Sequence, residues 1–179
     1  MRKIVFLALA FAPAAASAAA AYARYAHPRG DYVLEYPSGW KRSLGLGAVE
    51  LRPPGPAGER VSVTLERYPF GKDSPLTPED FEKRLRADVG RVKRLDAEGE
   101  ATAAGRKARK LALTVTAQLK DGGGAPIAPR KELYLILPKE GDGFYVLKFL
   151  GLGDAFDKNL PAFERIARHL KIPAPKRKK

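Results

Sequence analysis

The chain has 179 residues, no cysteine and a formal charge of +13 at pH 7. Without cysteine there is no disulfide framework, no lipid-modified cysteine, no thiolate nucleophile and no zinc site of the cysteine type. The length suits a single domain held by its hydrophobic core, and the abundance of Ala, Arg, Gly and Pro is typical of a GC-rich bacterial genome.

The first 18 residues have the pattern of a secretory signal peptide. Arg2 and Lys3 form its positive end, a short apolar run follows, and small residues surround the predicted cleavage site after Ala18, with Ala20 as a near alternative. A retained membrane anchor is disfavoured because the run is shorter than the roughly 20 apolar residues that a spanning helix needs. The protein is therefore expected to be exported, to the periplasm or the outside. Loss of Arg2 and Lys3 lowers the charge by two, to +11, which favours anionic partners.

A polar arm is predicted over residues 19–30, ahead of a single domain over residues 31–172. An alternating strand begins at Asp31 and ends in a bend, Tyr36–Gly39, directly before Trp40, the only tryptophan. Burying roughly 200 Å² of indole stabilises a fold by several kcal/mol, at about 25 cal/mol per Å². We therefore expect the bend to direct Trp40 into the core, while a stacking platform for a ligand is the alternative.

A first amphipathic helix is predicted to begin at Pro78, where proline is tolerated because the first helical amide needs no partner. Thr77 is the expected N-cap, and Asp80 occupies the capping-box position. The apolar face of this helix is expected to consist of Phe81, Leu85, Val89 and Val92.

The remaining pattern contains further strands and a second principal helix. Pro161 is placed in the first turn of that last helix, where its missing donor matters least. The apolar face of the last helix consists of Phe156, Leu160, Phe163, Ile166 and Leu170. Strands are expected near residues 48–52, 60–68, 98–103, 108–119, 132–137 and 143–150. This order predicts an α+β domain, with a mainly antiparallel sheet flanked by two principal helices.

Three segments resemble PsbP-like domains. "YVLEYPSGW" is similar to the family's opening, "TAAGRKARKLALTVT" to its middle hairpin with Gly105 at the turn, and "FYVLKFLGLGDAFDKNLPAFERIARHLK" to its final strand and helix. The resemblance implies an α-β-α sandwich, as in the extrinsic photosystem subunit, exported DcrB-like proteins and a nuclear-import factor. It also implies an accessory or binding role rather than catalysis. The leader resembles no thylakoid targeting sequence, and the family's metal-associated residues do not map onto this chain.

Catalytic motifs are absent from the sequence. It has no H-E-x-x-H, no G-x-S-x-G and no Walker-type phosphate loop. His27 lies in the predicted arm, and His169 is near the end of the last helix, where a cation complements the helix dipole. Asp154 and Asp157 are expected to be ordinary dipole partners at that helix's start. We therefore predict no catalytic residue, no cofactor and no metal site, with a small hydrolase using paired carboxylates as an alternative.

Basic clusters are the candidate contacts to an anionic surface, where each cation contributes on the order of 1 kcal/mol. The candidates are Arg91, Lys93 and Arg94; Arg106, Lys107, Arg109 and Lys110; and Lys176, Arg177, Lys178 and Lys179 in a basic tail over residues 173–179. The first two clusters make one patch if they meet in space. Alternatively, they rim the sheet edges and discourage aggregation. No aromatic residues are interleaved as in nucleic-acid-binding motifs, so no specific nucleic acid partner is expected.

Together these patterns predict an exported, non-enzymatic accessory or binding protein that docks on a protein or an anionic envelope partner. A second hypothesis is an envelope-surface protein that attaches electrostatically, in peripheral contact with the membrane surface and without a transmembrane segment after signal cleavage. The structural core is expected to include Tyr36, Pro37, Trp40, Phe81, Leu85 and Phe163.

Overall fold

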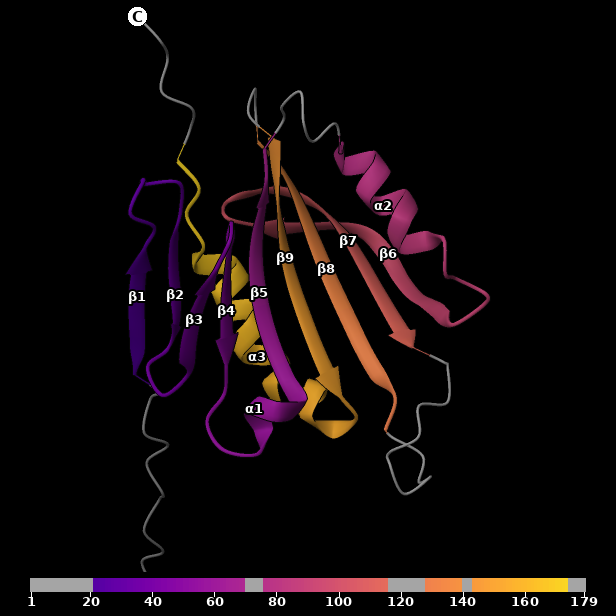
Figure 1. Ribbon diagram of the computed structural model, residues 1–179, viewed down its shortest axis with the longest axis horizontal. Helices are drawn as coiled ribbons and strands as arrows, with labels where there is room; N and C mark the ends of the chain where they lie inside the picture. The colour runs from indigo at the N-terminus through magenta and orange to yellow at the C-terminus, as the bar shows by residue number, and fades with distance from the viewer. Residues whose placement is uncertain (1–20, 70–75, 116–127, 140–142, 174–179) are drawn as a thin grey trace, which may run out of the picture.

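The computed structural model describes residues 21–69, 76–115, 128–139 and 143–173. The predicted signal peptide and the four cations of the predicted tail lie outside these residues. The described chain forms nine strands and three helices (Figure 1). The strands are β1 (Tyr22–Ala26), β2 (Val33–Pro37), β3 (Lys41–Gly45), β4 (Ala48–Arg52), β5 (Val61–Tyr68), β6 (Lys93–Ala103), β7 (Arg106–Val115), β8 (Arg130–Lys139) and β9 (Gly143–Leu152). The helices are α1 (Ala57–Arg60), α2 (Pro78–Arg86) and α3 (Asp154–His169).

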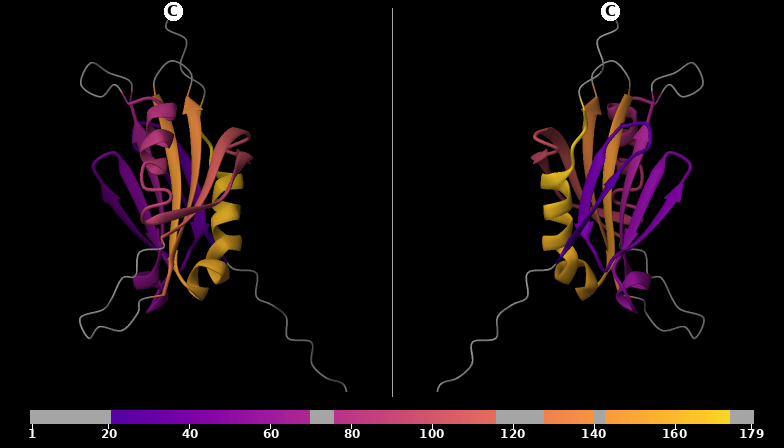
Figure 2. Two further views of the ribbon diagram at one scale, coloured as in Figure 1. Left: turned by 90° about the vertical axis from the view of Figure 1, so that its right-hand side faces the viewer. Right: turned by 90° about the vertical axis from the view of Figure 1, so that its left-hand side faces the viewer.

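Seven strands form one antiparallel sheet in the order β3-β4-β5-β9-β8-β7-β6, and β1 and β2 form a separate antiparallel pair. Figure 2 shows α2 and α3 on opposite faces of the large sheet, which makes the domain a three-layer sandwich. The predicted α+β class is confirmed. None of the three described helices has the length and apolar character needed to cross a membrane.

The two faces of the sheet carry cores of different size. The larger core lies under α3, where the ring of Phe163 stacks on Phe149 at 5.0 Å between centroids. The smaller core lies under α2, around Phe144 and Tyr134. Of the predicted core residues, Tyr36, Trp40 and Phe163 are buried, whereas Pro37, Phe81 and Leu85 are only partly buried. The short helix α2 therefore covers its face less completely than α3 covers the other.

The bend before Trp40 lies one residue later than predicted. Pro37 is still paired with Tyr22 as the last residue of β2, and the Trp40 amide donates to the Pro37 carbonyl at 2.9 Å. A proline is tolerated there because it ends a strand of a two-stranded sheet, where one edge needs no amide donor. Trp40 is 9% exposed and belongs to the core under α3.

Three predicted boundaries are wrong. Part of the predicted arm is strand β1, so the folded unit includes residues ahead of position 31. The first helix ends at Arg86 because the chain turns at Gly90, whose φ is +85°, and Val89 is therefore exposed. Pro161 lies inside α3 rather than in its first turn, because the helix already begins at Asp154.

Candidate functional site

The first two predicted basic clusters lie at opposite ends of the β6–β7 hairpin. Lys93 pairs with Val115 at the open end, and Ala103 pairs with Arg106 beside the turn. The two-residue turn, Ala104–Gly105, has positive φ at both positions, as a type I′ hairpin requires. At about 3.3 Å per residue, the hairpin places roughly 30 Å between Lys93 and Arg106, and roughly 16 Å between Arg94 and Gly99, the partner of Lys110. The two clusters are therefore spread along the hairpin.

Acids or carbonyls engage most of the described residues of these clusters. Arg94 Nε lies 2.7 Å from Asp96 Oδ1, and Lys107 Nζ lies 3.1 Å from Glu100 Oε2. Further ion pairs join Arg91 to Asp88, Lys93 to Glu132 and Arg109 to Glu82, and Arg106 donates to the Ile172 carbonyl. Lys110 lines a hollow of about 530 Å³ between α3 and the β6–β7 hairpin, together with Arg168. Cations that already have one acid each contribute little to the attraction of a further anion.

A different set of cations converges where the sheet face beside α2 is left open. The smaller core, on which α2 packs, consists mainly of residues from β7, β8 and β9. Toward β4 and β5 the same face carries polar side chains in register. Lys41 lies opposite Arg52, Glu50 opposite Thr64, and Thr64 opposite Lys148. Antiparallel sheets commonly present such a polar face to water.

A hollow of about 290 Å³ lies at the end of this face and is lined by three arginines, which define the arginine hollow. Arg52 ends β4, Arg60 ends α1 and Arg130 begins β8. Their side chains are 43%, 44% and 41% exposed, so each guanidinium is accessible to a ligand. Ser62 and Leu150 lie among the other lining residues, and Glu59 is the acid at its edge.

Local backbone geometry holds α1 beside the end of β4. Arg52 Nη1 donates to the Gly58 carbonyl at 2.9 Å. A Cβ at Gly58 would lie only 2.3 Å from the Pro53 carbonyl oxygen, so this close approach of two backbone segments requires glycine. The segment "RPPGPAGER" thus contains a one-turn helix that positions Arg60, where the sequence predicts only a loop between strands.

Each arginine of the hollow also contacts an acid. Arg52 Nη2 lies 2.8 Å from Glu50 Oε1, and Arg60 Nη2 lies 3.1 Å from Asp154 Oδ1. Arg130 Nη2 lies 2.8 Å from Glu132 Oε1.

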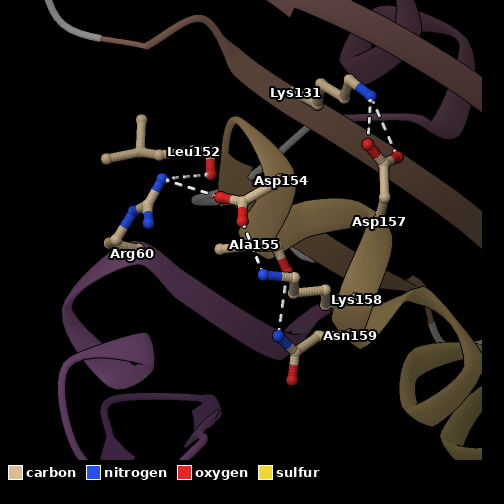
Figure 3. A network of polar contacts seen from close by, with 8 residues as sticks. All are labelled: Arg60, Lys131, Leu152, Asp154, Ala155, Asp157, Lys158 and Asn159. Carbon is tan, nitrogen blue, oxygen red and sulfur yellow. Dashed lines mark hydrogen bonds and ion pairs between the residues drawn. The ribbon is translucent and has the colours of Figure 1, made fainter.

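Two of these three acids are already neutralised by lysines. Figure 3 shows Asp154 between Arg60 and Lys158, whose Nζ lies 2.7 Å from Asp154 Oδ2. The hydrogen bond from Lys158 is the main cause that lowers the pKa of Asp154. Glu132 binds Lys93 Nζ at 2.9 Å. Two acids therefore face four cations.

Glu132 is ionised although it is buried. Burial raises its pKa, but the hydrogen bond and charge of Lys93, with a hydrogen bond from Tyr134, outweigh that effect and lower it. Because Lys93 and Lys158 already balance the two acids, Arg130 and Arg60 leave two positive charges, of which Glu59 in the lining offsets one. The hollow therefore carries a positive surplus.

A hollow of about 440 Å³ under α2 is lined by the paired carboxylates Glu79 and Glu82, together with Arg109. Burial raises the pKa of Glu82, but hydrogen bonds from Arg109 and Arg86 outweigh it and lower the pKa. A carboxyl group held ionised in this way is a poor general acid, because a general acid needs a raised pKa.

The histidines and acids form no larger cluster. His27 Nδ1 lies 3.3 Å from Asp31 Oδ2, and His169 Nδ1 lies 3.5 Å from Glu35 Oε2. Asp157, predicted as a dipole partner, accepts from Lys131 Nζ at 2.9 Å (Figure 3). Within the described parts of the chain, no three His, Asp or Glu side chains are grouped to hold a metal ion.

No protein-family model matches the chain, and no curated protein matches its sequence. Among solved structures it is similar to cyanobacterial PsbP (CyanoP) from Synechocystis sp. PCC 6803, with a TM-score of 0.56 and 16% identity over 90% of this chain and 98% of that one. A Bacteroides thetaiotaomicron protein has a TM-score of 0.55 and 10% identity over 87% of this chain and 50% of that one. LpqN, involved in cell envelope biogenesis of Mycobacterium tuberculosis, has a TM-score of 0.50. It is 14% identical over 87% of this chain and 91% of that one.

These likenesses define the class of fold as an α-β-α sandwich around an antiparallel sheet. The chain has a PsbP-like fold, and the resemblance found in three segments of its sequence is confirmed at that level. At these identities the likeness carries architecture and no ligand chemistry.

Proposed function

We propose that the mature protein is an exported, non-enzymatic accessory protein that docks on an anionic partner in the cell envelope. The observation that carries this proposal is the surplus of cations at the arginine hollow, at the end of the sheet face beside α2. Long-range attraction to an anionic surface depends on such uncompensated charge.

Two further features support the same role. The leader has the pattern of a secretory signal, and the mature chain keeps a charge of +11 after Arg2 and Lys3 are lost from +13. The PsbP-like fold is consistent with an accessory role, because LpqN, one of the proteins that shares it, is itself involved in cell envelope biogenesis. The lowered pKa of Glu82 speaks against an acid–base pair under α2.

The proposal is tested by sedimenting the mature protein with vesicles of phosphatidylcholine, with and without phosphatidylglycerol, over a range of NaCl concentrations. We expect binding only to the acidic vesicles, with a steep loss as salt screens the charges. Deleting residues 174–179 separates this role from attachment by the tail. A truncated protein that keeps most of its binding supports docking by the folded domain. Binding that vanishes with the tail, or that salt does not affect, contradicts the proposal.

A further inference from the structure

The arginines of the hollow keep hydrogen-bond donors that the described residues do not use. A guanidinium has five N–H groups. Arg60 uses only Nη2, toward Asp154 and the Leu152 carbonyl, so its Nε and Nη1 are not engaged within the described chain. Arg130 binds Glu132 through Nε and Nη2, which leaves Nη1. Arg52 donates to the Gly58 carbonyl through Nη1 and to Glu50 through Nη2, so its Nε is not engaged within the described chain. Three separate elements thus offer donors around one space.

The number of these donors favours one kind of anion. Carboxylates present two oxygens in a plane, and phosphodiesters present two terminal oxygens and one charge. A phosphate monoester presents three terminal oxygens in a tetrahedral arrangement and carries close to two charges at neutral pH. Guanidinium groups bind such oxygens through short charge-assisted hydrogen bonds. Three arginines around one space match three oxygens.

Charge and size agree with this ligand. Arg60 and Arg130 are the two cations whose acids are also bound by Lys158 and Lys93, and Glu59 in the lining offsets only one of these two charges, so the hollow keeps a positive charge toward an anion. A hollow of about 290 Å³ lies just below the range of 300 to 1,000 Å³ typical of pockets for whole small molecules. It therefore suits a headgroup whose remainder stays outside.

We propose that the arginine hollow binds a phosphate monoester group, and that this group is the feature of the anionic partner that the protein recognises. The inference rests on the proposed function, because it names the ligand for the same surface. Arg52, Arg60 and Arg130 each bind one phosphate oxygen. Glu59, exposed at the edge, opposes binding and limits affinity.

The first test is titration of the mature protein with inorganic phosphate, followed by calorimetry and by phosphorus NMR at a pH above 7. We expect R60Q to weaken binding about tenfold or more, since a hydrogen bond to a charged group is lost. E59Q should tighten it severalfold, because the opposing charge is removed. R52Q/R60Q/R130Q should abolish it. The matched control is R24Q/R84Q/K171Q, which removes the same charge from exposed positions away from the hollow and should leave phosphate binding unchanged.

The second test distinguishes a lipid headgroup from free phosphate. Vesicles with phosphatidic acid carry the monoester, whereas those with phosphatidylglycerol carry only a diester. Competition between inorganic phosphate and phosphatidic acid vesicles identifies the headgroup as ligand, and phosphate binding without competition identifies the free ion. Both outcomes support phosphate binding at the arginine hollow.

Equal phosphate binding by wild type and R52Q/R60Q/R130Q, or no phosphate binding by a folded wild type, overturns the inference. If phosphatidylglycerol vesicles still bind in that case, the inference alone fails. If phosphate binds but no acidic vesicle does, the proposed docking role fails instead. Far-ultraviolet circular dichroism confirms that each variant is folded.

Discussion

Replacing Glu132 with glutamine should strongly destabilise the fold. Glu132 is 2% exposed and accepts hydrogen bonds from Lys93 Nζ at 2.9 Å and from Tyr134 Oη at 3.0 Å, while Arg130 lies 2.8 Å away. Glutamine keeps the shape of the side chain but removes its charge. Lys93, only 15% exposed, would then be a buried cation without an acid, whereas Arg130 can turn into water.

The magnitude follows from how much charge stays buried. Breaking a buried ion pair by removing one partner costs about 3–5 kcal/mol, and the exposure of Arg130 places this case near 3 kcal/mol. For a domain of this size, that loss lowers the melting temperature by about 6–12 °C. Lys93→Met should cost less, about 1 kcal/mol, because Glu132 keeps Arg130 and Tyr134. Losing both partners should cost less than the sum of the two single changes, by about 1 kcal/mol or more.

Urea unfolding followed by the fluorescence of Trp40, the only tryptophan, measures these free energies. The folded-state pKa of Glu132 is lowered below its ordinary value, because Lys93 outweighs the effect of burial. Its stabilising contribution is thus complete above the ordinary glutamate pKa and is lost as the pH falls through the folded-state pKa. The deficit of E132Q should be largest at neutral pH and shrink below about pH 4. An unchanged free energy at pH 7, or strictly additive single effects, would refute the reasoning.

Three further changes test other parts of the fold, each by thermal and urea unfolding. Thr77→Ala removes the side-chain cap on the Asp80 amide and should cost about 1 kcal/mol, so an unchanged midpoint would show that the cap contributes nothing. Gly151→Ala places a Cβ 2.8 Å from the Phe156 backbone and should cost about 1–3 kcal/mol, whereas Gly39→Ala, which meets open space, should change stability by no more than about 0.5 kcal/mol. Phe163→Ala, in the core under α3, should cost about 3–5 kcal/mol, and equal or greater destabilisation by Phe81→Ala would contradict the difference in burial between the two faces.

Local chemistry allowed much of this fold to be predicted from the sequence. The start of α2 follows from the cap at Thr77, and the alternation in β2 and β4 follows from the burial of one face. By contrast, β3 (Lys41–Gly45) has five exposed residues, so no alternation of burial marks it as a strand. Its pairing is set by β4, which lies beside it in the sheet.

The arginine hollow could not be predicted, because its members are far apart in the sequence. Arg52, Arg60 and Arg130 meet only through the order of strands β4, β5, β9 and β8. The four cations at residues 105–110 are close together in the sequence but do not lie on one face. Successive residues of a strand point to opposite faces, so Lys107 and Arg109 lie on one side and Lys110 on the other.

A polar sheet face is ordinarily a solvated surface, and at the arginine hollow on the face beside α2 two acids are each shared by two cations. On a solvated surface, charges of both signs are interspersed and pair singly, as Lys107 does with Glu100 and Arg94 with Asp96. Such pairs contribute little to stability and present little net charge. At the arginine hollow, Glu132 and Asp154 each bind a lysine as well as an arginine, so the arginines keep their charge toward solvent. The arginines of the hollow can therefore attract an anion although each already contacts an acid.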